Sequence, residues 1–331
     1  MTHISIMEGN TMGFVVESGV LKKYIEEPGV TFVEIPEGVT SIDEDAFADC
    51  ETVSSVVFPS TFKNVSSLDR LNSLKNLEQL REFLVDDQNP YYTSVEGILY
   101  NKDMTALLSC PMNVDLSKLE IPDSVEYIRY DAFYGCHTLR EVIIPESVER
   151  IGFGAFLYCK HLRSVRLPSY ICLNDDTFWG CTELEELINS ENLVGIYPNA
   201  LEGCDSLKKL RLGEPASYFY FSLSFGCRNL EEIEVDPSNP DFSSEDGVLY
   251  NKDKTVLCFC PYGKRGELVL PESVVQIGGD TYAGICDCQE LTSIRLPAGL
   301  KRINAYTFKY CPGLEPISLP DGVEVMGSCR R

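Results

Sequence analysis

The sequence is poor in positive charge and has no long apolar run. Its 28 lysines and arginines stand against 51 acidic residues, which gives a formal net charge of −23. A chain this acidic offers no positive field to a phosphate backbone, so the composition argues against nucleic-acid binding. No stretch approaches the roughly 18 to 20 consecutive apolar residues that a membrane helix needs, so we expect no membrane insertion.

Histidine and tryptophan are also scarce, with three copies and one copy. The sequence contains no G-x-S-x-G, no G-x-x-x-x-G-K and no H-E-x-x-H, which are the phrases of common hydrolase, phosphate-binding and zinc-protease sites. Carboxylate pairs occur everywhere because acids are so frequent, and they do not indicate a glycosidase. We therefore expect a protein that is not an enzyme, with no catalytic residue and no cofactor.

A phrase of about 23 residues recurs along most of the 331-residue chain. The cysteines at 136, 159, 181, 204 and 227 are separated by 23, 22, 23 and 23 residues, within the template A-F-x-x-C-x-x-L-x-x-V-x-I-P-x-S-V-x-x-I. This length falls in the range of leucine-rich repeats, in which each coil contributes one short strand. One coil buries too little apolar surface to offset its ordering, so coils must stack. The strand phrases begin at Val30, Val53, Leu80, Leu116, Leu139, Leu162, Leu184, Leu207, Leu230, Arg265, Leu291 and Leu314, which predicts about twelve coils.

Two steps between coils are long because they contain the same insert. Residues 89–111 are NPYYTSVEGILYNKDMTALLSCP and residues 239–261 are NPDFSSEDGVLYNKDKTVLCFCP. Each insert has two β-rich runs around Asn-Lys-Asp, which is typical of a β-hairpin. A degenerate third copy, SGVLKKY, begins at Ser18. We therefore expect an N-terminal cap with a degenerate hairpin over residues 1–29, followed by a single repeat domain over residues 30–331.

The phrase I-P-x-S-V-x-x-I-x-x-x-A-F-x-x-C-x-x-L, together with the insert D-G-V-L-Y-N-K-D-x-T, resembles the BspA-like class of bacterial leucine-rich repeats. The resemblance covers roughly residues 14 to 326. It implies a β-rich, right-handed leucine-rich-repeat solenoid with little helix, a parallel sheet on the concave face and two inserted β-hairpins. It also implies a non-enzymatic recognition protein at the bacterial surface or secreted, which binds host or matrix proteins.

The first 13 residues carry no positively charged segment before an apolar run and no small-residue cleavage site. Such a start lacks the features of a secretory signal, so the sequence itself favours the cytoplasm, whereas the resemblance favours the cell surface or secretion. Two functions stay open. One is a recognition solenoid that binds a protein or a glycan-bearing partner, as in surface adhesion. The other is an intracellular scaffold whose partner is another copy or another cytosolic protein.

Eight of the 14 cysteines occupy the same position of the repeat. A side chain fixed to a repeat position is a packing element first, and parallel Cβ vectors in neighbouring coils disfavour a disulfide. We expect a ladder of buried, reduced thiols beside backbone carbonyls. The pairs Cys258/Cys260 and Cys286/Cys288 have C-x-C spacing, which differs from the spacing of familiar zinc sites, so no metal site is predicted.

The concave sheet offers a candidate binding surface because the x positions of L-x-x-V-x-I face solvent. Their charge alternates from coil to coil. In the predicted register, Lys208 falls between Glu185 and Glu231, and Lys209 falls between Glu186 and Glu232. One interpretation is a mixed-charge groove whose cations bind an acidic partner. The other is that adjacent strands neutralise each other, at roughly 0.2 to 1 kcal/mol per pair. The candidate anchors are Arg163, Arg166, Lys208, Lys209 and Arg211.

An aromatic cluster is the second candidate surface. Tyr218, Tyr220 and Phe221 stand where other coils have polar or small residues, and the single tryptophan, Trp179, lies two residues before Cys181. Exposed aromatic side chains on a polar edge mark contact sites. The alternative is that this irregular coil packs the rings over its own missing Ala-Phe pair. On either interpretation we expect a protein partner, while its identity and the oligomeric state stay open.

Overall fold

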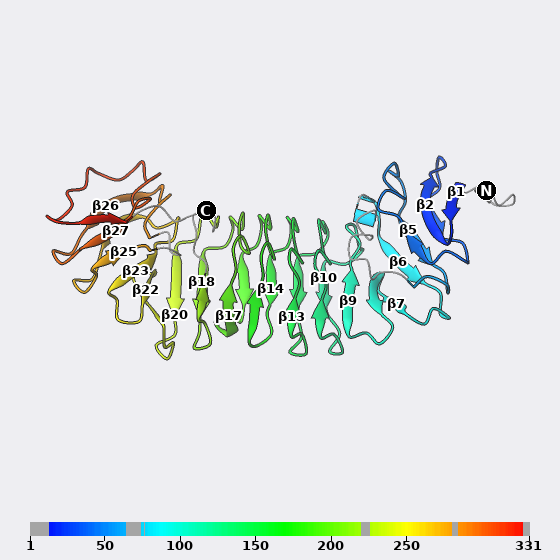
Figure 1. Cartoon of the computed structure of the whole chain (residues 1–331), viewed down its shortest axis with the longest axis horizontal. Helices are drawn as coiled ribbons and strands as arrows, with labels where there is room; N and C mark the ends of the chain where they lie inside the picture. The colour runs from blue at the N-terminus through cyan, green and yellow to red at the C-terminus, as the bar shows by residue number, and fades with distance from the viewer. Residues whose placement is uncertain (1–12, 64–73, 76, 220–225, 280–283, 327–331) are drawn as a thin grey trace.

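The fold is a solenoid of short β-strands with almost no helix. The computed structural model describes residues 13–63, 74–75, 77–219, 226–279 and 284–326. The coils stack in one elongated row, with the N-terminal strands at one end and β26 (Leu291–Arg295) and β27 (Arg302–Asn304) at the other (Figure 1). The predicted β-rich solenoid of about twelve coils is confirmed.

The L-x-x-V-x-I phrases form one set of parallel strands, which we call the front face. The register puts the same repeat position side by side in successive coils, as in Val142 opposite Val165 and Val165 opposite Leu187. Their inward side chains are fully buried, so each strand adds to one continuous core. The front strands are β3 (Phe32–Glu34), β5 (Ser55–Phe58), β6 (Glu82–Val85), β10 (Lys118–Glu120), β12 (Glu141–Ile143), β14 (Ser164–Arg166), β16 (Glu186–Ile188), β18 (Lys209–Leu212), β20 (Glu232–Val235), β24 (Gly266–Val269) and β26.

The S-V-x-x-I half of the repeat forms a second set of short strands on the opposite side of the core, the back face. These strands also pair in parallel, for example Ile128 with Ile151. The back strands are β4 (Ser41–Ile42), β11 (Tyr127–Ile128), β13 (Arg150–Ile151), β15 (Ile171–Leu173), β17 (Leu193–Ile196), β19 (Tyr218–Phe219), β25 (Gln276–Ile277), β27 and β28 (Glu324–Met326).

Each insert is a three-stranded antiparallel unit that contains the predicted hairpin and one further strand. Both central residues of its first turn, Glu96-Gly97 and Asp246-Gly247, have positive φ. Turns of this kind match the twist of a two-residue hairpin. The last strand of each insert then pairs in parallel with a back strand and starts a new ladder there. The insert strands are β7 (Tyr92–Val95), β8 (Ile98–Asn101) and β9 (Ala106–Ser109), and then β21 (Phe242–Glu245), β22 (Val248–Asn251) and β23 (Val256–Phe259).

The N-terminal hairpin repeats this arrangement with one strand fewer. Strand β1 (Gly13–Glu17) pairs antiparallel with β2 (Val20–Ile25), through a turn at Ser18-Gly19 that again has positive φ. Strand β2 pairs in parallel with β4, as β9 pairs with β11. The SGVLKKY segment lies in this hairpin, and β2 takes the position of the last insert strand rather than of the middle one.

One buried asparagine fastens each insert to the preceding coil. Asn239 is fully buried, and its Nδ2 donates to the carbonyls of Gly213 and Ala216 at 2.7 and 2.8 Å. Its Oδ1 accepts from the N–H groups of Asp241 and Phe242 at 2.9 and 2.7 Å. Asn89 makes the same four bonds in the first insert. The sequence comparison showed both asparagines but assigned them no role.

The front face is not one continuous sheet. It divides into β3-β5-β6, β10-β12-β14-β16, β18-β20 and β24-β26. Two of the breaks lie at the inserts, where the hairpin turn covers the outer strand edge. Phe83 N–H donates to Gly97 O at 2.8 Å beside β6, and Ile233 N–H donates to Gly247 O at 2.9 Å beside β20. The expected parallel sheet therefore exists as four segments.

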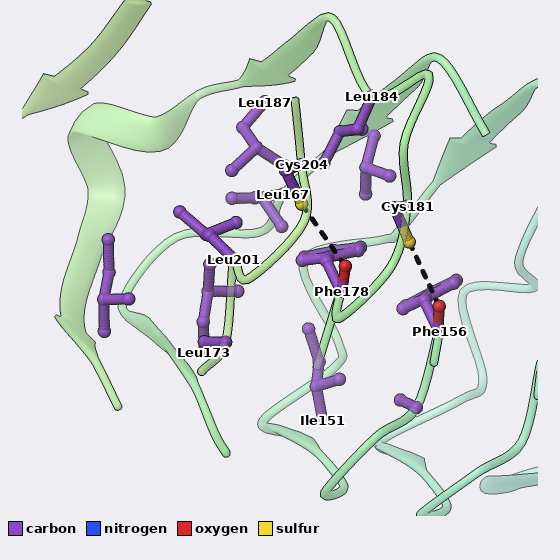
Figure 2. Packing of buried hydrophobic residues seen from close by; sticks show 14 of the residues in the cluster. Ile151, Phe156, Leu167, Leu173, Phe178, Cys181, Leu184, Leu187, Leu201 and Cys204 are labelled. Atoms are coloured by element: carbon purple, nitrogen blue, oxygen red, sulfur yellow. Dashed lines mark hydrogen bonds between the residues drawn. The ribbon is translucent and has the colours of Figure 1, made fainter. Parts of the chain in front are cut away.

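The core contains the ladder of cysteines and the phenylalanines of the Ala-Phe phrase. The Phe133 and Phe156 rings stack at 4.6 Å, and the next ring follows at 5.1 Å. Three successive thiols, of Cys159, Cys181 and Cys204, donate to the phenylalanine carbonyl of the preceding coil, as Cys181 Sγ does to Phe156 O at 3.1 Å and Cys204 Sγ to Phe178 O at 3.3 Å (Figure 2). The expected burial beside backbone carbonyls is confirmed.

The twelfth strand phrase, which begins at Leu314, has no front strand. Glu315 N–H donates to Thr292 O at 3.0 Å, as in earlier coils, but the next residue is Pro316. In the coil of β14 the equivalent residue, Ser164, donates its N–H to the preceding coil. Proline has no N–H and cannot extend a ladder, so β26 is the last strand of the front face.

Candidate functional site

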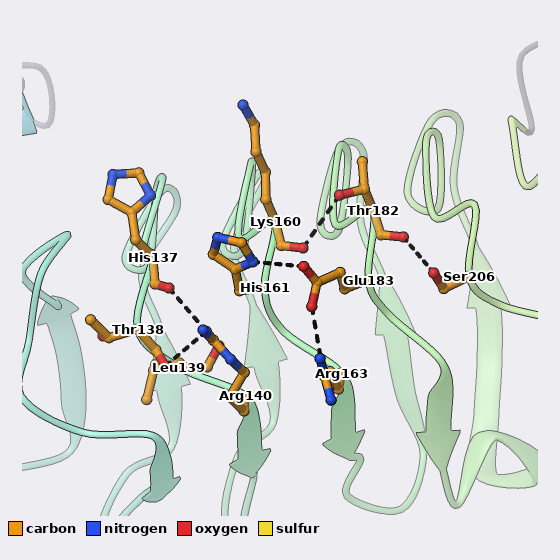
Figure 3. A network of polar contacts seen from close by, with 10 residues as sticks. All are labelled: His137, Thr138, Leu139, Arg140, Lys160, His161, Arg163, Thr182, Glu183 and Ser206. Carbon is orange, nitrogen blue, oxygen red and sulfur yellow. Dashed lines mark hydrogen bonds and ion pairs between the residues drawn. The ribbon is translucent and has the colours of Figure 1, made fainter.

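The front face places the predicted cations on or directly beside two strands, β14 and β18, but most of them already have partners. Arg163 Nε donates to Glu183 Oε2 at 3.3 Å, and Glu183 Oε1 lies 2.7 Å from His161 Nδ1 (Figure 3). These contacts, the one from His161 first, hold the pKa of the Glu183 carboxyl below its usual value. Arg163 is therefore part of a network within the protein, which extends from the strand to the turn that carries His161.

Lys209 forms the predicted ion pair with the next strand, β20, and Arg211 forms a further ion pair with that strand. Lys209 Nζ lies 3.3 Å from Glu232 and 3.0 Å from Glu234, and Arg211 Nε lies 3.1 Å from Glu234. Hydrogen bonds to the two glutamates, Glu234 first, raise the pKa of Lys209. For these two residues the structure favours neutralisation between strands.

The ladder does not extend to β16, because the sheet breaks between β16 and β18. Asn189 occupies the position at which other coils have an inward apolar residue such as Ile144 or Leu167. It has φ 66° and ψ 27° and starts the short 3-10 helix η2 (Ser190–Asn192). Its Nδ2 donates to Leu167 O at 3.3 Å. A left-handed residue cannot continue a strand, so the predicted pairing of Glu186 with Lys209 is wrong.

Two of the predicted cations, Arg166 and Lys208, are exposed and take part in no ion pair within the described ranges. The predicted pair of Lys208 with Glu231 is also wrong, since Glu231 instead lies 3.8 Å from Arg265. In the β12-β14-β16 sheet, Arg166 lies in register between Ile143 and Ile188. The guanidinium therefore has a half-buried isoleucine on either side.

Two of the four aromatic candidates, Tyr218 and Trp179, lie in the described part of the chain. Tyr218 lies in β19, whereas Tyr220 and Phe221 fall outside the described residues. Trp179 is half-buried, and its ring centroid lies 6.2 Å from that of Tyr158, which is 5.9 Å from Tyr134. Sequence reasoning missed both tyrosines. The available signal was their position one or two residues before a ladder cysteine, in two coils that directly precede the coil of Trp179.

The described residues give no indication of a metal centre or a membrane span. Over those ranges, no three histidine, cysteine or acidic side chains converge in a way that could hold a metal ion. No helix in the described part of the chain is long and apolar enough to cross a membrane.

Stacked 23-residue coils with parallel front strands and an aliphatic core define a leucine-rich-repeat protein. A family model described as "BspA type Leucine rich repeat region" matches in six copies, over residues 23–84, 109–231 and 257–329. The chain therefore belongs to this family. The two stretches between the matched ranges hold the first two strands of each insert.

Solved structures share the fold at low sequence identity. A leucine rich cell surface protein from Faecalibacterium prausnitzii has a TM-score of 0.54 at 18% identity, over 96% of this chain and 83% of that one. A leucine-rich repeat protein from Bacteroides ovatus has a TM-score of 0.52 at 20% identity, over 98% and 90%. Against a leucine-rich repeat protein from Eubacterium ventriosum, the TM-score is 0.44 at 21% identity, and the match covers 89% of this chain but 62% of that one. No protein with a curated description matches the chain.

Proposed function

We propose that the chain is a non-enzymatic recognition module whose front face binds a protein partner. Leucine-rich-repeat proteins generally mediate protein-protein interaction, and their stacked strands present an extended surface for it. The repeat occupies most of the chain.

The surroundings of Arg166 carry this proposal. An exposed arginine with apolar neighbours on both sides and no ion pair can bind a carboxylate without first breaking an internal contact. Arginines of this kind are enriched among the residues that dominate binding energy in protein interfaces. Arg163, Lys209 and Arg211 would each have to give up a glutamate. We therefore place the anchor for an acidic partner at Arg166. Lys208 is a second cation, beyond the break between β16 and β18.

Two charge-reversal variants test whether Arg166 is the anchor. The partner is captured from source-cell lysate and culture supernatant with the wild-type chain, identified, and titrated against Arg166→Glu and Arg295→Glu. Arg295 is also exposed on the front face but is paired with Glu267 at 3.1 Å in the last sheet segment. We expect a loss of about tenfold or more in affinity for Arg166→Glu alone. Equal affinities of both variants and the wild type would refute the anchor.

We extend the proposal to an adhesive role at the bacterial surface. Its support is that the structurally similar Faecalibacterium protein is a cell surface protein, together with the family. Protease treatment of intact source cells tests the location, since a surface protein is cleaved while a cytosolic control is protected. The alternative is a scaffold that self-assembles. Assembly by adding a strand to the front face beside β26 is not favoured, because Pro316 lies at that edge and blocks strand addition.

A further inference from the structure

A row of three aromatic rings crosses consecutive coils at the corner that precedes the ladder cysteines. We call Tyr134, Tyr158 and Trp179 the aromatic ridge. Their ring centroids are separated by 5.9 and 6.2 Å, with interplanar angles of 80° and 46°. At the Tyr134 end, Lys75 lies 5.2 Å above the ring and is paired with Asp131. The ridge therefore forms one contiguous aromatic surface that is separate from the front face.

Tyr158 has an unfavourable backbone conformation for its residue type. Its φ is 61°, at the position directly before the cysteine, where Gly135, Gly180 and Gly203 have φ of 63°, 75° and 76°, and where Asp287 and Tyr310 have φ of 56° and 57°. A bulky residue in the left-handed region is an outlier, and such strain is concentrated at functional sites. The side chain is 38% exposed, so burial of the ring does not account for the strain.

The glycine of the next coil makes room for the Tyr158 ring. A Cβ at Gly180 would lie 2.6 Å from that ring. The Tyr158 ring thus rests against the bare backbone of the following coil. This contact fixes the ring in place before any ligand arrives, which lowers the entropy cost of binding.

Half-buried carboxylates adjoin the Trp179 end of the ridge. Asp175 and Asp176 lie in the same turn as Trp179, and the Oδ1 atom of each is buried without a hydrogen-bond partner. Glu202 occupies the position of Trp179 in the next coil. Burial, and secondarily the charge of Asp176, raises the pKa of both the Asp175 and the Glu202 carboxyls.

We infer that the aromatic ridge and the adjoining carboxylates bind a neutral glycan chain. The C–H faces of pyranose rings pack on tyrosine and tryptophan, and their hydroxyl groups donate to carboxylates beside the rings. A net charge of −23 and the carboxylates at the site repel acidic glycans, so the ligand is uncharged. Successive rings on successive coils suit a linear polymer rather than a single sugar. This site is independent of the protein-binding proposal for the front face.

Trp179 is the single tryptophan of the chain, so its fluorescence reports directly on the ridge. The full chain is titrated with soluble neutral glucan, mannan, xylan and galactan, with an anionic glycan, and with a proline-rich peptide. Tyr158→Gly removes the central ring at a position where glycine is the usual residue, so it relieves strain and should not lower the melting temperature. Tyr310→Gly is the matched control, because Tyr310 has φ 57° before a ladder cysteine and is 72% exposed, but lies outside the ridge.

We expect a saturable change in Trp179 fluorescence with at least one neutral polysaccharide, weakened by about tenfold or more in Tyr158→Gly and unchanged in Tyr310→Gly. The proposal is overturned if no neutral glycan binds, if only the anionic glycan or the peptide binds, or if Tyr158→Gly binds as tightly as the wild type. Since the sheet anchor Arg166 is not altered in any of these variants, the outcome is distinct from that of the front-face experiment.

Discussion

Replacement of Asn239 by alanine should release the second insert from the coil that precedes it. The side chain is fully buried and makes four hydrogen bonds of 2.7 to 2.9 Å, two as a donor and two as an acceptor. Alanine would leave the carbonyls of Gly213 and Ala216 and two backbone N–H groups without these partners. At about 1 kcal/mol for each net hydrogen bond, the free energy of unfolding should fall by about 4 kcal/mol.

Asn229→Ala is the matched control, since Asn229 is exposed and makes one bond, to Asp205 O at 2.8 Å. Its loss should cost less than about 1 kcal/mol. Asn239→Asp keeps the shape and the two acceptor bonds but turns a carboxylate toward two carbonyls, so it should be about as harmful as alanine. These comparisons separate hydrogen bonding from packing.

Urea unfolding measures the total loss in the free energy of unfolding, and amide hydrogen exchange shows which strands lose protection. We expect faster exchange in β21 and β22, because stability in a repeat protein is a sum of local contributions and the insert should open first. Asn89→Ala should have an effect of similar size in the first insert, since Asn89 makes the equivalent four bonds. A loss below about 1 kcal/mol for Asn239→Ala, or one spread evenly over all coils, would refute this account.

Two further predictions concern the packing of the coils. Gly152→Ala should lower the free energy of unfolding, measured in urea, by about 1 to 3 kcal/mol, because the added Cβ would lie 2.3 Å from Tyr130 N. Gly299→Ala is the control. A Cβ there would have no atom within 4 Å, so the free energy of unfolding should change by less than about 0.5 kcal/mol. Burial raises the pKa of the Cys181 and Cys227 thiols well above the ordinary 9.0. A thiol reagent at pH 8 should therefore modify neither cysteine until the chain unfolds. The melting temperature should fall as the pH rises above about 9, because the thiols ionise in the unfolded chain and stay protonated in the folded one. A melting temperature that does not change between pH 8 and pH 10 would contradict this.

The periodic features could be predicted from the sequence because one cause repeats in every coil. A cysteine such as Cys204 recurs in phase with inward leucines, so its burial follows from the spacing alone. The strand phrases, the hairpin at Asn-Lys-Asp and the alternation of charge follow in the same way. Predicted pairs were correct where the ladder is regular, as for Lys209 with Glu232.

The errors lie where one residue departs from the period. Asn189 replaces an inward aliphatic residue, and its left-handed conformation ends β16 and separates Glu186 from Lys209. Arg163 pairs with Glu183, which lies in the turn before the next strand rather than at the same repeat position. Register arithmetic considers only equivalent positions, so it cannot find such a partner. The backbone strain at Tyr158 could not be predicted from the sequence either. A tyrosine in place of a glycine indicates strain only once its φ is known.

The three hairpins explain why the chain is built from segments. Each hairpin starts a new back-face ladder, at β2, β9 and β23, and the two inserts also end a front-face segment through Gly97 and Gly247. The buried side chains fall into three clusters that change near these points. A long uniform parallel sheet accumulates twist and misalignment, whereas a hairpin with its own antiparallel register sets the alignment again. The inserts therefore act as internal caps, and the longest uninterrupted front segment, from β10 to β16, is the one that presents Arg166.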